Sequence, residues 1–208
     1  MQPPQYQQGI FDCETLVLNL ADADVEYHPE FYAEHAAWDL YNSLLDNTDW
    51  QQDTITVYGK THLTPRLTRW VGEPWMDYTY SNHTMKACSW EPLLLSIKQQ
   101  IENATGESFN SVLLNYYRDG KDSNGWHSDD EPELGEQPVI ASLSLGAPRA
   151  FHLRHKRDKS LRHNMTLEHG SLLMMRGKTQ ACWQHHIPKR AKAEGRLNLT
   201  FRTIVRKD

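Results

Sequence analysis

The sequence predicts an α+β protein in which helices cover one face of a β-sandwich or jelly roll. The first half carries two segments with apolar residues at helical spacing, and the second half carries many short strand-like segments separated by Gly and Pro. A chain of 208 residues is long enough for one domain with a sizeable core. We expect residues 1–28 to form an irregular N-terminal extension and residues 29–208 to form the domain.

Two amphipathic helices are expected in the first half. Pro29 is suited to the first turn of a helix, and apolar residues recur at helical spacing from there to about Asp46. The second helix is expected from Trp90 to about Ala104. Ser89 is a suitable N-cap for it, and Gly106 is a suitable stop signal.

The remaining elements are expected to be strands. Residues 54–58 alternate in polarity as a short strand does, whereas residues 60–82 are rich in Thr, Pro, Trp and Tyr and suggest loops and short strands. The candidate strands after the second helix are Ser111–Tyr117, Val139–Leu145, Arg149–Arg154, Met165–Leu167, Ser171–Met175, Cys182–His186 and Leu197–Val205.

Composition excludes several classes of protein. No run of about 18 apolar residues is present, so no transmembrane helix is expected. The Gln- and Pro-rich N-terminus lacks the apolar segment of a signal peptide. Cys13, Cys88 and Cys182 are far apart and odd in number, which excludes a disulfide scaffold or a zinc site built on paired cysteines. We therefore expect a cytoplasmic protein, or a nuclear one in a eukaryote.

Charge is unevenly distributed along the chain. The formal net charge is −5, but residues 1–104 carry a balance of −10 and residues 105–208 a balance of +5. A local basic face, rather than the charge of the whole chain, decides the affinity for phosphates. The alternative is a basic face that is only solvated.

The segment Trp126–Asp130 carries the first chemical motif. His127 and Asp129 are two residues apart, so a strand would point both side chains to one face. Two His and one carboxylate form the facial triad that binds Fe(II) and leaves three positions open. The third donor can come from Trp183–Pro188, where His185 and His186 point to opposite faces of a strand. The residue pattern alone does not choose between His185 and His186. The alternative for His127 and Asp129 is that they form a coincidental surface pair without a metal.

A second motif lies near the C-terminus. Between Arg196 and Arg202, polar residues alternate with Leu197, Leu199 and Phe201, so one face of the strand is polar and the other apolar. Two inward-facing Arg side chains would be costly unless they meet anions, and a dicarboxylate would satisfy them. The alternative is that the Arg face is in solvent. Upstream, the segment 115–117 places an amide and a phenol on one face.

Together these motifs resemble the AlkB family of Fe(II)/2-oxoglutarate dioxygenases, which reverse alkyl damage on nucleic-acid bases. The resemblance extends from about Val57 to Ile204. Its anchors are N-Y-Y-R-D-G at 115–120, W-H-S-D-D-E at 126–131, H-G-S-L-L-M-M at 169–175, W-x-H at 183–185 and R-L-N-L-T-F-R at 196–202. The closest likeness is to members that repair double-stranded DNA, through V-Y-G-K at 57–60 and Y-T-Y-S at 78–81.

The resemblance implies a role for each matching residue, with no catalytic side chain beyond the metal ligands. The iron ligands would be His127, Asp129 and His185. The 2-oxoglutarate contacts would be Asn115, Tyr117, Arg196, Asn198, Thr200 and Arg202. The substrate contacts would be Tyr58, Gly59, Lys60, Tyr78, Tyr80, Asp130 and Glu131, with Tyr58 filling the gap left by a flipped base. Phosphate contacts are expected from Arg66, Arg157, Arg162, Arg190 and Lys192.

The implied fold is a double-stranded β-helix, or jelly roll, at residues 111–208, preceded by a helical and nucleotide-recognition part at residues 29–110. The implied activity is oxidative demethylation of 1-methyladenine and 3-methylcytosine in DNA, with release of formaldehyde and conversion of 2-oxoglutarate to succinate and CO2. Fe(II), 2-oxoglutarate and O2 would be the cofactors. The partner would be alkylated DNA, single- or double-stranded. The protein would act as a monomer and would not bind a membrane.

Two other classes of function stay open. One is the same oxygenase chemistry on RNA or protein. The other is a non-enzymatic nucleic-acid-binding module with a degenerate metal site.

Overall fold

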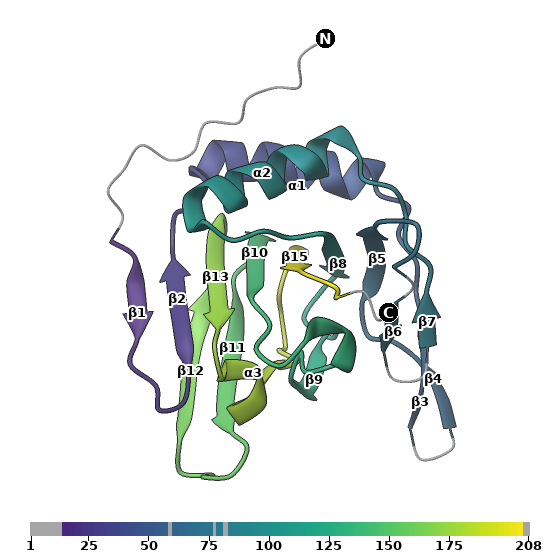
Figure 1. Ribbon diagram of the computed structural model, residues 1–208. Coiled ribbons are helices and arrows are strands. Elements are labelled where there is room, and N and C mark those ends of the chain that lie inside the picture. Colours follow the sequence, from purple (N-terminus) through teal and green to yellow (C-terminus); the bar gives the residue numbers. More distant parts are fainter. Residues whose placement is uncertain (1–13, 58–59, 77, 81–82, 206–208) are drawn as a thin grey trace.

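Two antiparallel sheets face each other, and helices α1 (Glu34–Asn47) and α2 (Pro92–Thr105) cover the outer face of the larger sheet (Figure 1). The computed structural model describes residues 14–57, 60–76, 78–80 and 83–205. No helix within this part of the chain is long and apolar enough to cross a membrane.

The larger sheet has seven strands in the order β1-β2-β13-β10-β15-β8-β5, and the smaller has four in the order β12-β11-β14-β9. The strands of the larger sheet are β1 (Leu16–Leu18), β2 (Asp24–His28), β13 (Ser171–Arg176), β10 (Ile140–Gly146), β15 (Arg196–Arg202), β8 (Ser111–Tyr117) and β5 (Leu67–Gly72). Those of the smaller sheet are β12 (Arg162–Leu167), β11 (Arg149–His155), β14 (Trp183–Ile187) and β9 (Asn124–His127). The hairpins β3–β4 (Thr54–Val57 and Lys60–Leu63) and β6–β7 (Tyr78–Tyr80 and His83–Met85), the single-turn helix η1 (Pro132–Leu134) and the short helix α3 (Thr179–Cys182) complete the described elements.

The two faces of the larger sheet contact different parts of the protein. Apolar side chains on its outer face, such as Leu143 and Leu199, pack with Leu40 and Ile97 of the two helices. A second apolar cluster fills part of the space between the sheets and includes Phe151. Side chains alternate between the faces of a strand. The residues next to the helix-facing ones therefore point into the space between the sheets, where the polar cavity described below lies.

The jelly-roll prediction is confirmed, and so are most of the expected strands, each to within a few residues. The expectation of irregular chain over residues 1–28 is wrong for β1 and β2. The latter pairs with β13 in the larger sheet. Val25 and Tyr27 of β2 are buried and alternate with polar residues, a pattern too short to stand out in the sequence. The division of the chain into an extension and a domain stays a prediction.

Both helices begin later than expected. The backbone N–H of Tyr32 donates to the carbonyl of Gly170, which keeps the chain before Glu34 out of the helix. Ser89 is not the cap of α2. Proline disfavours a helical conformation in the residue before it, so Glu91 is extended and α2 begins at Pro92. Gly106 does end this helix in the left-handed conformation, as predicted.

Gly170, within the H-G-S-L-L-M-M motif, provides a test of this packing. It has φ +74, and an added Cβ would lie 2.6 Å from the carbonyl oxygen of Tyr32. Gly106 has nearly the same φ, +73, but an added Cβ there meets nothing within 4 Å. We expect Gly106→Ala to lower the free energy of unfolding by about 1–2 kcal/mol through backbone strain alone. Gly170→Ala should lower it by roughly 1–3 kcal/mol more because of the clash. Urea denaturation of both variants measures the difference, and equal losses would contradict the close approach.

Candidate active site

Three metal-binding side chains meet where β9 and β14 pair. His127 is directly opposite His185 in the antiparallel ladder, and their ring centroids are 4.3 Å apart. Asp129, two residues beyond His127, places its carboxylate 3.9 Å from His185 Nε2. The potential ligand atoms of the three residues all lie within 4.8 Å of one another. Two imidazole nitrogens and one carboxylate oxygen in this arrangement fit Fe(II) and leave room for further ligands.

Hydrogen bonding and burial prepare both imidazoles for a metal. Nδ1 of His127 lies 2.8 Å from the carbonyl oxygen of Gly125, so it carries the proton and leaves the lone pair of Nε2 for an ion. Burial lowers the pKa of His185 to about 3, because a charged ring is poorly solvated there. His185 is therefore neutral at physiological pH and able to act as a ligand.

Asp129 is almost fully buried and ion-paired. Only 2% of the residue is exposed, and its Oδ1 accepts a hydrogen bond of 2.7 Å from Nη2 of Arg202. Burial alone would raise the pKa of this carboxyl, but the positive charge of Arg202 and its hydrogen bond hold it below its usual range. Asp129 therefore stays a carboxylate, the form that binds a cation.

Two further side chains fix the loop that carries Asp129. The buried Gln180 of α3 accepts a hydrogen bond of 3.0 Å from the backbone N–H of Asp129. Ser128 donates to the carbonyl of Trp183, 2.8 Å away. These contacts tie the loop to the segment that leads into His185. No sequence pattern predicts the role of Gln180, because its helix has only four residues.

His186 points to the opposite face of β14, away from the triad. Its ring stacks on Trp126 at a centroid distance of 3.9 Å, and its Nε2 lies 3.0 Å from Nδ1 of His152. The guanidinium of Arg154 lies 4.1 Å from the Trp126 ring centroid on this outer face. The alternation of side chains along the strand therefore leaves His185 as the member of the pair that faces the other two ligands.

The polar face of β15 points into the space between the sheets. The four polar side chains of this strand are all buried and line a cavity of about 50 Å3 together with the His-Asp-His triad. They are Arg196, Asn198, Thr200 and Arg202. Arg196 is 1% exposed and donates to Ser144 Oγ, but its Nε and Nη1 have no hydrogen-bond partner among the described residues. Burial lowers the pKa of Arg196 to about 10, so it remains a cation at neutral pH. A buried cation with unused donors indicates that the cavity is built for an anion.

Tyr117 lies between two buried guanidinium groups. The guanidinium carbons of Arg196 and Arg149 are 5.3 and 5.5 Å from its ring centroid. Arg149 donates to the backbone carbonyls of Asp119, Asp122 and Pro188 and so holds together the loops beside the cavity. The sequence predicts Arg149 only as the start of a strand and does not predict that its side chain joins these loops.

Asn115 also faces the cavity, where its Oδ1 accepts a hydrogen bond of 2.8 Å from Arg66 Nε. Arg66 Nη1 donates to Asn124, whose amide in turn lies 3.2 Å from His127 Nε2. This position does not fit the expected role of Arg66 as a phosphate contact. Its side chain is buried and faces the cavity, so it is not a surface contact for phosphates.

The remaining expected residues either do not line the cavity or lie outside the described part of the chain. Asp130 is exposed and pairs with Lys156 at 2.8 Å, and Glu131 is half-buried. Arg157 and Arg162 are exposed on the β11–β12 hairpin, and Arg190 and Lys192 are exposed in the loop after β14. Tyr58 and Gly59 lie outside the described residues, as do the side chains of Lys60, Tyr78 and Tyr80.

A family model described as the 2OG-Fe(II) oxygenase superfamily matches residues 24–202. The chain belongs to this family. Fe(II), 2-oxoglutarate and O2 are its cofactors, and the donor set of the triad and the buried cations fit them. The sequence-based resemblance to the AlkB branch is also confirmed by the relatives described next.

Curated relatives carry AlkB-type names. The chain is 47% identical over 186 residues to "Alpha-ketoglutarate-dependent dioxygenase alkB homolog 3" of Bos taurus, a match that covers 85% of this chain and 64% of the relative. It is 37% identical over 210 residues to "DNA oxidative demethylase ALKBH2" of Arabidopsis thaliana, covering 88% of this chain and 67% of the relative. The chain thus spans about two thirds of the length of the curated relatives that it matches.

The fold also has a solved counterpart. The structure of OsALKBH1 superimposes with a TM-score of 0.65 at 18% identity, covering 91% of this chain and all of that one. At this identity the likeness supports the fold alone.

The two adjacent histidines of β14 allow a direct test of the metal site. His185→Ala removes a ligand and should weaken Mn2+ binding by more than roughly 100-fold, since even residues that only support ligands contribute about 10–100-fold. His186→Ala, the matched control, should keep most of the affinity because His186 faces away. Electron paramagnetic resonance of free Mn2+ gives both affinities. Loss in His186→Ala with retention in His185→Ala would reverse the assignment.

Proposed function

We propose that this protein is a Fe(II)/2-oxoglutarate-dependent dioxygenase that demethylates N-alkylated bases in DNA, with 1-methyladenine and 3-methylcytosine as substrates and formaldehyde as product. The observation that carries the proposal is the His127/Asp129/His185 triad and the buried Arg196 in one cavity. The names of the AlkB-type relatives support the substrate class. We assign the iron to the triad and the co-substrate to the polar face of β15 with Asn115 and Tyr117.

The side chains of this chain provide binding, orientation and exclusion of water. When bound, iron and 2-oxoglutarate supply the oxidation of the N-methyl group by O2, with formation of succinate and CO2. Arg196 has unused donors at Nε and Nη1 that a carboxylate in the cavity can accept. Arg202 neutralises Asp129 and keeps it oriented. Because these groups are buried, their electrostatic interactions are stronger than in water.

A methylated base must leave the helix stack to reach this cavity. A methyl group on the pairing edge blocks pairing, so the damaged base costs less to extrude than a normal one. The β3–β4 and β6–β7 hairpins project on the same side of the molecule as β5 (Figure 1). The substrate contacts expected from the sequence in these two segments are Tyr58, Lys60, Tyr78 and Tyr80. Asp130 is exposed and follows the metal-binding Asp129 directly in the chain. We propose these residues as the surroundings of the flipped base.

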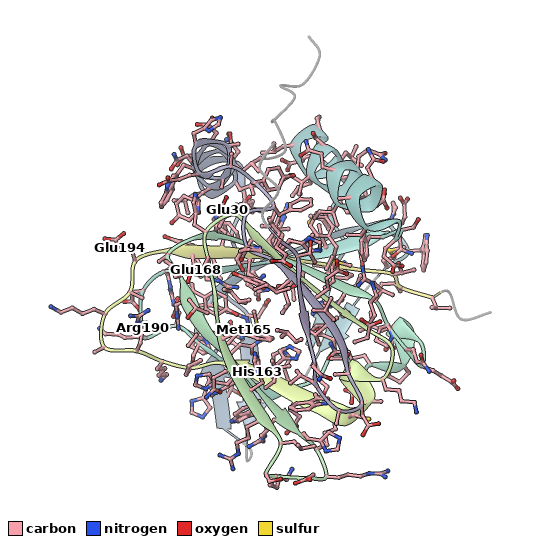
Figure 2. All side chains as sticks on the ribbon, turned by 90° about the vertical axis from the view of Figure 1, so that its left-hand side faces the viewer. Glu30, His163, Met165, Glu168, Arg190 and Glu194 are labelled. Carbon is pink, nitrogen blue, oxygen red and sulfur yellow. The ribbon has the colours of Figure 1, made fainter. Side chains whose placement is uncertain are left out.

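The basic residues proposed to contact phosphates do not form one patch. Arg157 and Arg162 belong to the β11–β12 hairpin, whereas Arg190 and Lys192 lie in the loop before β15. Figure 2 shows His163 of β12 well apart from Arg190. A nucleic acid would therefore contact the two groups at separate points along its backbone. Such contacts weaken as salt rises.

Turnover of 2-oxoglutarate tests the proposal. Succinate and formaldehyde are measured at one salt concentration with a 1-methyladenine oligonucleotide in single-stranded DNA, duplex DNA and RNA of the same sequence. We expect the two products in equal amounts, with methylated DNA as a substrate. Preference for RNA would move the substrate to the alternative class. Absence of turnover in all three would leave only the non-enzymatic alternative or a protein substrate.

Arg196→Lys keeps the charge but loses the two-pronged donor geometry. We expect the affinity for 2-oxoglutarate, measured by calorimetry with Mn2+ in place of iron, to fall about 10- to 100-fold, or roughly 1–3 kcal/mol. DNA affinity without co-substrate should barely change. Arg154→Lys on the outer face of β11 is the control and should bind 2-oxoglutarate normally. An unchanged affinity in Arg196→Lys would remove this residue from the co-substrate site.

Tyr58→Ala tests the proposed base flipping. An aromatic ring that fills the gap left by the flipped base is useful only in a duplex, where loss of stacking costs a few kcal/mol. We expect repair of 1-methyladenine to fall much more in duplex than in single-stranded DNA. The ratio of the two rates at fixed salt is the readout. An equal loss on both substrates, or none, would remove Tyr58 from this role.

A further inference from the structure

Outside the iron site, the described residues contain a second group of metal-binding side chains. Asp22, His155 and Cys182 place a carboxylate oxygen, an imidazole nitrogen and a sulfur within 4.8 Å of one another. The three residues are far apart in the sequence, so no short sequence motif predicts that they meet. None of them belongs to the cavity that holds the His127/Asp129/His185 triad.

The fold brings three chain segments together at this point. Asp22 lies in the β1–β2 turn, His155 is the last residue of β11, and Cys182 is the last residue of α3. All three segments lie at the lower end of the molecule in Figure 1. The backbone N–H of Lys156 donates to the carbonyl of Cys182 at 2.7 Å, which fixes the end of β11 against α3.

The environment of His155 indicates that this group of side chains binds a ligand. It is only 6% exposed, and its Nε2 is buried without a hydrogen-bond partner among the described residues. This nitrogen lies 3.7 Å from the carboxylate of Asp22, beyond hydrogen-bonding distance. The ring packs edge-on against Trp183 at 5.3 Å. A buried polar atom without a partner is costly, and a bound ion would satisfy it.

The donor types select the class of ion. A thiolate is a soft ligand, an imidazole is intermediate and a carboxylate is hard, a combination that suits Zn2+ or Co2+ and not Mg2+ or Ca2+. Three protein ligands leave a fourth tetrahedral position for water. Asp22 is exposed and lies on a turn, and Cys182 is half-buried, so ions in solution can reach the site.

We propose that Asp22, His155 and Cys182 form a second metal site that takes Zn2+ or a similar ion and joins the β1–β2 turn, β11 and α3. The site does not depend on the proposed dioxygenase activity. Its position does connect it to the iron site, because Gln180 of the same short helix holds the backbone of Asp129. Binding of the ion therefore stabilises the helix that positions an iron ligand.

Binding of an ion requires proton changes at His155 and Cys182. Nδ1 of His155 accepts a hydrogen bond of 3.0 Å from the backbone N–H of Asp158, so the metal-free ring carries its proton on Nε2. On binding, the thiol of Cys182 releases one proton to solvent, and the ring proton moves from Nε2 to Nδ1. The hydrogen bond from Asp158 is then lost. The Asp158–Ser160 turn, which is exposed, must therefore move when the ion binds.

Co2+ provides a direct probe, because a cobalt–thiolate bond gives a charge-transfer absorption that a site without sulfur cannot give. We expect wild-type protein to bind two equivalents of Co2+, one at each site, and to show this absorption. Cys182→Ser should bind one equivalent and lose the absorption. Cys88→Ser, the matched cysteine control, should keep both. The His127→Ala/His185→Ala double variant should lose one equivalent and keep the absorption.

Two results would overturn the proposal. One is a wild-type stoichiometry of a single Co2+. The other is an absorption that survives Cys182→Ser. Asp22→Asn, on an exposed turn, serves as a second variant that should fold and should weaken Co2+ binding by about 10-fold or more. The backbone amide signal of Asp158 in a nitrogen–proton NMR spectrum should shift on Zn2+ addition in wild type and not in Cys182→Ser.

Discussion

The buried ion pair between Arg202 and Asp129 is the interaction on which the rest of the site depends. Removing two charges from water is expensive, and breaking such a pair by deleting one partner leaves an uncompensated buried charge. Here the carboxylate is held at 2.7 Å by a residue of the larger sheet, while Asp129 itself follows a strand of the smaller one. The pair therefore fixes the distance between the sheets where the metal ligands meet. It also leaves the second carboxylate oxygen, Oδ2, on the side of His185.

Strand β15 links core packing to the chemistry of the cavity. Leu197, Leu199 and Phe201 pack under the helices, and the residues between them line the cavity. A shift of register by one residue would exchange the two sets, exposing the apolar residues to the cavity and burying guanidinium groups under the helices. The position of the proposed co-substrate pocket is therefore set by the same alternation that builds the core.

The sequence predicted the elements whose patterns are local and left out those that depend on distant contacts. The alternation in β15 and the family match at W-x-H predicted which residues meet in the site, and Gly106 predicted where α2 ends. Gln180 and Arg149 were missed because their partners are backbone groups far along the chain. Arg66 was expected to contact phosphates, and its burial depends on Asn115 and Asn124, which are distant in the sequence. The start of α2 was misplaced because the effect of Pro92 on Glu91 outweighed a good capping residue at Ser89.

The central claim is that the triad and the buried guanidinium groups form one site in which metal and co-substrate bind together. Calorimetry of 2-oxoglutarate, with and without Mn2+ on the protein, tests this most directly. If the metal and 2-oxoglutarate contact each other in the cavity, binding of one favours the other, and linkage requires the same factor in both directions. We predict that Mn2+ raises the affinity for 2-oxoglutarate by at least about 10-fold, or roughly 1.4 kcal/mol. Equal affinity with and without the metal would contradict the claim.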